Sequence, residues 1–317
     1  MSFRRLVGFG EAMLRMTVRD GGSIETATSL DCSVGGAELN ACIAAARAGM
    51  PATWVSALPD DPLARLVRRH VRANGVDAEI VTVEHARLGL YFLEMAPSPR
   101  PLRITYDRAG SAFALLDPGR IDWRTVLGPD ACLLLTGITP PLGLGPRKGL
   151  EEALAAARDA GATVALDVNY RSALWSREEM SRWLRAVLPE VDVLSAGPDD
   201  LSAAGLEGED PVAEAVRHFE LRAAVTTSKR RVDDAMDLEV RVVTPDGEHR
   251  AEARAGVVDP IGAGDALLGT FLAHLPNGDV RSATQLGLSA AVTCLGLFGD
   301  ALVDDPWDAS EGRGVVR

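Results

Sequence analysis

Cysteine and histidine are scarce in this chain, and neither residue forms a cluster. The 317 residues include four cysteines and five histidines. The cysteines stand far apart, without a C-x-x-C pair, at Cys32, Cys42, Cys132 and Cys294. In a chain of this length, isolated cysteines are typical of small buried side chains in a reducing compartment, which argues against a disulfide framework. The histidines give no H-E-x-x-H spacing, so we expect no zinc site.

Positive charge and long apolar runs are also in short supply. The 33 Lys and Arg against 45 Asp and Glu give a net charge of -12, which argues against nucleic acid as a partner. A local pocket of amides and arginines can still hold a small phosphorylated molecule. The apolar stretch from Leu286 to Phe298 is too short to cross a bilayer, and the short apolar run before Gly8 is unlike a signal peptide. We therefore expect a cytoplasmic protein that binds neither membrane nor nucleic acid.

Short apolar runs alternate with helical patterns along most of the chain. Strands are predicted at 6–9, 53–57, 131–136, 163–168, 191–195 and 223–227. Helices are predicted at 37–48, 62–73, 150–160, 177–187 and 211–219. This order predicts an α/β fold with a mostly parallel central sheet, helices on both faces and ligands at the carboxyl ends of the strands.

Two segments interrupt that alternation. Residues 14–34 are polar and rich in glycine, and residues 88–106 contain two extended runs separated by Pro97, Pro99 and Pro101. Such runs are typical of antiparallel strands joined by a turn, so we expect a small second sheet that acts as a lid over a site. No repeat and no linker divides the chain, which predicts a single domain.

The segment Asp259-Pro-Ile-Gly-Ala-Gly-Asp265 carries the strongest chemical signal. The amides of Gly262, Ala263 and Gly264 stand where a helix should begin, and they can converge on an anion. Asp265 follows at once and can accept a proton from a hydroxyl group near that anion. An anion cradle beside a carboxylate is what phosphoryl transfer to an alcohol requires. A helix that simply begins after a glycine turn is the alternative.

Four shorter motifs carry weaker signals. They are Val7-Gly-Phe-Gly10, Ser33-Val-Gly-Gly-Ala-Glu-Leu-Asn40, Tyr106-Asp-Arg-Ala-Gly-Ser-Ala112 and Asp167-Val-Asn-Tyr-Arg171. The first indicates only a tight strand exit. The other three offer amides, carboxylates and arginines suited to a polyol or an anion, although each also fits a helix entry or a surface loop.

Together these segments resemble the ribokinase family, also called the phosphofructokinase-B carbohydrate kinases. Gly35-Gly36-x-x-x-Asn40 is similar to the family's sugar-binding signature, and Asp259 to Asp265 is similar to its catalytic signature. The resemblance implies one ribokinase-like domain over 1–317, with lid segments at about 12–34 and 88–108. It also implies ATP and Mg²⁺, Asp265 as the base, and an anion hole of Gly262, Ala263 and Gly264.

Within the family, the chain most resembles the kinases of 2-keto-3-deoxygluconate, a sugar acid. That likeness implies eight substrate contacts: Gly35, Gly36, Asn40, Tyr91, Tyr106, Arg108, Arg171 and Asp300. Two arginines would suit the carboxylate of an acid. A kinase of a neutral sugar such as fructose or ribose and a non-catalytic binding protein of the same fold are the alternatives. Family resemblance also predicts a homodimer, for which Leu90, Phe92 and Ile104 could supply an apolar face.

The nucleotide side departs from the family pattern. Where the family has Asn-x-x-Glu, this chain has Gly197 and Asp200, and the segment from Thr226 to Val232 contains no glycine. The basic residues 229–231 are interpreted as a solvated turn. The resemblance implies nucleotide contacts at Asp200, Thr226, Ser228, Gly262 and Gly264, whereas the metal ligands remain unassigned.

Overall fold

Two β-sheets and their flanking helices make up the part of the chain that the computed structural model describes, residues 2–18, 22–95, 102–203, 205–206, 208–232 and 235–303. The strands of the larger sheet are β1 (Arg5–Phe9), β4 (Ala52–Leu58), β5 (Asp77–Thr82), β8 (Ala131–Thr136), β9 (Thr163–Asp167), β10 (Val193–Ser195), β11 (Ala223–Val232), β12 (Ala235–Thr244) and β13 (Gly247–Gly256). Within these described residues they run in the order β13-β12-β11-β10-β9-β8-β1-β4-β5. In this order, the seven strands from β11 to β5 are parallel to one another. Strands β12 and β13 extend the sheet antiparallel beyond β11.

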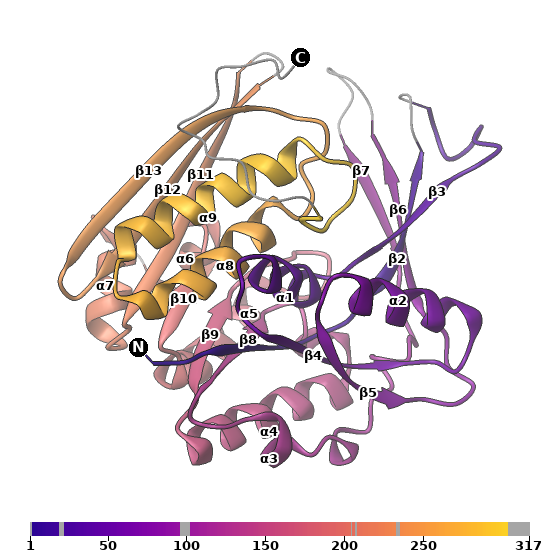
Figure 1. Ribbon diagram of the computed structural model, residues 1–317, viewed down its shortest axis with the longest axis horizontal. Coiled ribbons are helices and arrows are strands. Elements are labelled where there is room, and N and C mark those ends of the chain that lie inside the picture. The colour runs from indigo at the N-terminus through magenta and orange to yellow at the C-terminus, as the bar shows by residue number, and fades with distance from the viewer. Residues whose placement is uncertain are drawn as a thin grey trace.

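Helices cover both faces of this sheet, as Figure 1 shows. One face packs against α1 (Ala37–Arg47), α2 (Pro62–Ala73), α8 (Ala263–His274) and α9 (Val280–Leu295). The other packs against α3 (Trp123–Val126), α4 (Leu144–Ala160), α5 (Arg177–Val187), α6 (Pro198–Ala203) and α7 (Pro211–His218). Single-turn 3-10 helices lie at Pro118–Arg120, Pro140–Leu142, Leu188–Glu190 and Leu275–Asn277. The predicted α/β fold is thereby confirmed.

Local chemistry explains most of these elements. Every residue of β8 is buried, as expected of a central parallel strand between two helical layers. The carboxyl group of Asp61 caps α2 by accepting from the Ala64 amide at 2.8 Å, and Ser176 with Glu179 forms a capping box on α5.

Several elements differ from the sequence-based expectation. Helix α4 begins at Leu144 instead of Leu150, because Pro146 is tolerated in a first helical turn. Strand β11 continues to Val232, so the interpretation of residues 229–231 as a turn is wrong. Strand β12, which pairs with β11, and strand β13, which pairs with β12, were not predicted, although Thr244-Pro-Asp-Gly247 between them is a turn sequence.

The smaller sheet forms from the two segments that interrupted the alternation. It contains β2 (Met13–Val18), β3 (Asp31–Gly35), β6 (Gly89–Glu94) and β7 (Arg103–Asp107), in the order β3-β2-β6-β7. Figure 1 shows it standing out from the nine-stranded sheet. The three prolines predicted to separate β6 from β7 lie outside the described residues.

Two details of the smaller sheet correct the sequence analysis. Ile104 pairs with Leu93, so it lies on the face opposite to Leu90 and Phe92, and the three do not form one apolar face. Cys32 on β3 is exposed, whereas the other three cysteines are buried as expected.

Strand β1 lies between β8 and β4. Strands β4 and β5 extend the main sheet on one side of β1, and strands β8 to β13 extend it on the other. A crevice at the carboxyl ends of the strands is expected where the strand order reverses in this way. Residues that follow β1, β8 and β9, together with the smaller sheet, therefore surround one place.

Candidate active site

The amino end of α8 forms the centre of the site. Gly262 has a φ of +83°, and a Cβ atom there would lie 2.6 Å from the carbonyl carbon of Asp300, so this position requires glycine. The Ala266 amide donates to the Gly262 carbonyl at 2.8 Å, which makes it the first bond of the helix. The preceding amides have no partner inside the helix. A Cβ atom at Gly264 would meet nothing within 4 Å, so space is open beside this residue of the first turn.

Asp265 lies in the first turn of α8 and joins the two signature segments. Asn40 Nδ2, from α1, donates to its Oδ2 atom at 2.8 Å. Burial raises the pKa of Asp265 to about 8, opposed by the Asn40 bond and Arg171 and reinforced by the charges of Asp167 and Asp300. Asn40 is itself buried, and its Oδ1 atom has no hydrogen-bond partner among the described residues. The Asn40 side chain therefore links α1 to α8 through its amide nitrogen.

Tyr91 of the smaller sheet and Asp300, which follows α9, form one side of the site. Tyr91 on β6 donates its hydroxyl to Asp300, and burial with the neighbouring Asp300 charge raises the pKa of Tyr91. A Cβ atom at Gly35 would lie 2.5 Å from the Tyr91 hydroxyl oxygen, so only glycine leaves room for this pair. Gly36 likewise lies against the backbone of Glu11. Three expected substrate contacts thus lie together, namely Gly35, Tyr91 and Asp300.

Arg108 already has a carboxylate partner. Its Nε and Nη2 atoms donate to Glu11 Oε2 at 2.8 and 2.5 Å, and Ser111 donates its hydroxyl to Glu11 Oε1. The Arg108 guanidinium lies 5.8 Å from the centre of the Tyr106 ring, which in turn packs 5.9 Å from the Tyr91 ring. The expected group of Tyr91, Tyr106 and Arg108 is therefore contiguous.

Sequence reasoning missed Glu11 and left the role of Glu38 open between a polyol contact and a polar residue of a helix entry. Glu11 directly follows the first strand and Gly10, a position that could have marked it. Glu38 was interpreted as a possible polyol contact, but it is 2% exposed and accepts from Thr136 and Thr139 at 2.7 and 3.1 Å. Burial raises the pKa of Glu38 to about 7. Glu38 therefore ties α1 to the residues that follow β8.

The loop after β9 brings a second cation toward Asp265. Asn169 has a φ of +42°, a left-handed conformation that asparagine tolerates, and its Nδ2 atom donates to Asp167 at 2.9 Å. Burial raises the pKa of Asp167 to about 6. The charge of Arg171 lowers the pKa of both Asp167 and Asp265, so the arginine stands near the two carboxyl groups.

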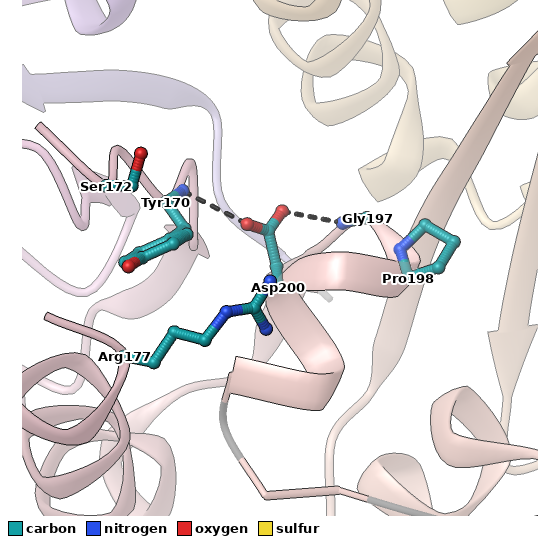
Figure 2. Close-up of a pocket in the computed structure, with 6 residues that line it drawn as sticks. All are labelled: Tyr170, Ser172, Arg177, Gly197, Pro198 and Asp200. Atoms are coloured by element: carbon teal, nitrogen blue, oxygen red, sulfur yellow. Dashed lines mark hydrogen bonds between the residues drawn. The ribbon is translucent and has the colours of Figure 1, made fainter.

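Asp200 joins two loops at a cavity of about 430 Å³. Its Oδ1 atom accepts from the Tyr170 amide at 3.1 Å and its Oδ2 atom from the Gly197 amide at 2.8 Å, as Figure 2 shows. The side chains of Ser172 and Arg177 line the same cavity. Both carboxylate oxygens of Asp200 thus hold backbone amides in addition to any role toward a nucleotide.

The remaining expected nucleotide contacts lie on β11. Thr226 lines a different cavity of about 390 Å³ beside Leu201 and Val212. Ser228 is exposed and donates to Glu239 Oε2 at 3.4 Å on β12. The neighbours of these two residues differ from those of Asp265. Gly262 and Gly264, by contrast, lie with Asp265 at the start of α8.

Within the described ranges, no group of three or more His, Cys, Asp or Glu side chains is arranged to hold a metal ion. In the same part of the chain, no helix has the length and apolar character needed to cross a membrane.

Comparison with known proteins places this site in a family. The chain is 36% identical to the 2-dehydro-3-deoxygalactonokinase of Haloferax volcanii, over 95% of this chain and 94% of that protein. It is 31% identical to the 2-dehydro-3-deoxygluconokinase of Thermoproteus tenax, over 96% and 93%. The crystal structure of the 2-dehydro-3-deoxygluconokinase of Thermotoga maritima superposes with a TM-score of 0.92 at 30% identity, covering 97% of each chain. The pattern of the pfkB family carbohydrate kinases matches residues 4–305, and the chain belongs to that family.

Proposed function

We propose that this carbohydrate kinase transfers the γ-phosphoryl group of ATP to the terminal hydroxyl of a sugar acid of the 2-keto-3-deoxygluconate class. The observation that carries the proposal is the hydrogen bond from Asn40 to Asp265, which joins the sugar-binding signature to the catalytic signature at the open amino end of α8. The names of the two relatives above support the acid class of substrate.

In the proposed reaction, Asp265 accepts the proton of the substrate hydroxyl. The hydroxyl oxygen forms a bond to the γ-phosphorus while the bond to the β–γ bridging oxygen breaks, and ADP leaves. The amides of Gly262, Ala263 and Gly264 stabilise the charge on the transferred group. The raised pKa of Asp265 favours its work as a base near neutral pH.

The residues at α8 fit a nucleotide phosphate. The helix end supplies amides without partners in the helix, and the space at Gly264 is open. Since no three-carboxylate group occurs among the described residues, phosphate oxygens and water would hold most of the Mg²⁺ coordination sphere, as this ion commonly prefers. When bound, Mg²⁺ supplies charge neutralisation at the phosphates.

We assign the substrate carboxylate to Arg108 and Arg171, with Tyr91 and Tyr106 beside them. One observation favours a second candidate, a kinase of a neutral sugar. Arg108 forms an ion pair with Glu11, whose side chain is 3% exposed. The charge of Arg108 is therefore already balanced in part before a substrate binds. Substrate choice therefore decides between the two candidates.

ADP release with ATP and Mg²⁺ tests the proposal against 2-keto-3-deoxygluconate, 2-keto-3-deoxygalactonate, fructose and ribose. We expect turnover with one or both acids. Arg108→Ala should lower kcat/KM for the acid by roughly 100-fold, because a charge-assisted bond is worth about 1.5–3 kcal/mol. Arg87→Ala, which breaks the exposed pair with Asp107, is the control and should change little. Turnover confined to a neutral sugar would refute the acid assignment.

Three further features of the expected protein remain proposals. We propose that the chain is one domain in which segments 12–34 and 88–108 serve as a lid, supported by the bond between Tyr91 on the smaller sheet and Asp300. We also propose a homodimer. Its interface needs apolar surface other than a face shared by Leu90, Phe92 and Ile104.

A further inference from the structure

Arg15 is a buried arginine on β2 that the proposed reaction does not use. Its side chain is 2% exposed and reaches from the smaller sheet to two distant segments. Its Nη1 atom donates to Asp300 Oδ1 at 2.6 Å, and its Nη2 atom donates to Asp259 Oδ2. Its Nε atom donates to the Thr17 hydroxyl oxygen at 2.8 Å. The guanidinium group therefore bridges two carboxylates that are almost completely buried.

These two carboxylates fix the backbone in front of α8. Asp259 Oδ1 accepts from the Ile261 amide at 3.1 Å, and its Oδ2 atom accepts from the Gly299 amide at 3.1 Å. The backbone of Asp300 lies directly against Gly262, whose missing Cβ atom would be 2.6 Å from the Asp300 carbonyl carbon. The path of residues 259–262, and so the direction of the amides at the helix end, depends on where these two aspartates lie.

The charges explain why a cation is required there. Burial alone would lower the pKa of Arg15, but the charges of Asp300 and Asp259 outweigh it and raise the pKa. Without the guanidinium, two buried carboxylates would face each other unneutralised. Such an arrangement is strongly unfavourable, so the side chains would separate or take up protons.

We propose that Arg15 is a positioning residue for phosphoryl transfer, which holds Asp259 and Asp300 so that the loop before α8 presents its amides to the transferred group. This inference rests on the function proposed for Asp265 and the amides of 262–264. It also means that the cradle is complete only when the smaller sheet is in place. A lysine would carry the charge but would not make the same paired contacts to both carboxylates, since its ammonium is a single point.

The test compares Arg15→Met and Arg15→Lys with Arg5→Met. Arg5 bonds to Asp130 and to the Val126 carbonyl at the amino ends of the central strands β1 and β8, away from the site, so its variant controls for the loss of a partly buried arginine. We expect kcat of Arg15→Met to fall roughly 100-fold, the cost of one misplaced oxyanion donor, and kcat of Arg15→Lys to fall roughly tenfold. Arg5→Met should keep its kcat.

Chemical rescue separates positioning from general destabilisation. Guanidinium chloride, kept below the concentration that lowers the wild-type melting temperature, should restore part of the kcat of Arg15→Met. Tetramethylammonium chloride, a cation that donates no hydrogen bonds, should not. If Arg15→Met does not fold, the same comparison is made with Arg15→Lys.

A folded Arg15→Met variant with kcat within about threefold of the wild type would overturn the inference, because a displaced cradle must slow the transfer step. Equal rescue by both salts would also overturn it. Asp265→Asn is measured in parallel: if that variant retains full activity, the proposed function fails, whatever the Arg15 variants do. If only Asp265→Asn loses activity, the function stands and the inference about Arg15 falls.

Discussion

Replacing Asp265 with asparagine should remove activity and at the same time stabilise the protein at alkaline pH. In the folded protein the pKa of Asp265 is raised from 3.8 to about 8, mainly by burial. The folded state therefore holds this proton more tightly than the unfolded chain does. The stabilising contribution of the protonated group is complete below about pH 3.8 and is lost as pH rises toward about 8.

The magnitude follows from the width of that interval. Each pH unit between the two pKa values changes the free energy of unfolding by about 1.4 kcal/mol, so the interval from pH 5 to pH 8 corresponds to at most about 4 kcal/mol. Asp265 is partly exposed, which reduces the expected change to about 2 kcal/mol. Asparagine has the same shape, carries no charge and can still accept the Asn40 bond through its amide oxygen.

Urea unfolding of the wild type and Asp265→Asn at pH 5, 6.5 and 8 provides the assay. The variant should gain stability relative to the wild type as pH rises, while its turnover falls by several orders of magnitude. Asp159→Asn, at an exposed position of α4, is the control and should give a difference that does not vary with pH. A stability gap for Asp265→Asn that stays constant or narrows toward pH 8 would refute the reasoning.

Two further substitutions test the walls of the site. Gly35→Ala should lower kcat/KM for the sugar by roughly tenfold or more, because the new methyl group would meet the carboxyl group of Asp300, whereas Gly256→Ala, where space is open, should leave kinetics unchanged. Asp200→Ala should destabilise the protein by about 2 kcal/mol, since two amides lose their acceptor, and thermal unfolding measures it. An unchanged melting temperature would show that these amides do not depend on the carboxylate. A higher KM for ATP would additionally support its expected nucleotide contact.

The sequence predicted those parts of the molecule that depend on local pattern. Apolar runs and capping residues sufficed for the central strands and most helices, and the glycines before Asp265 marked the amino end of α8. Charged pairs between distant segments were not predictable in this way. Arg15 lies 244 residues from Asp259, and Arg108 lies 97 residues from Glu11. No local spacing records such a partner.

Strands β12 and β13 show a second limit. Buried and partly buried side chains alternate in β12, and partly buried and exposed side chains alternate in the edge strand β13, so both lack the continuous apolar run that marked the inner strands. Only the turn sequence Thr244-Pro-Asp-Gly247 between them could have indicated a hairpin here. The same hairpin explains why the basic residues 229–231 lie in a strand and not in a turn.

The bridge from Arg15 to Asp259 and Asp300 also sets an order of assembly. All four strands of the smaller sheet lie before residue 108, while both of its carboxylate partners come from the last 60 residues of the chain. During synthesis the arginine is therefore made long before anything can neutralise it, and closing so long a loop is entropically costly until the main sheet has brought the two ends together. We therefore expect the proposed phosphate cradle at the amino end of α8 to form late in folding, and a chain that stops short of Asp300 to lack a complete cradle.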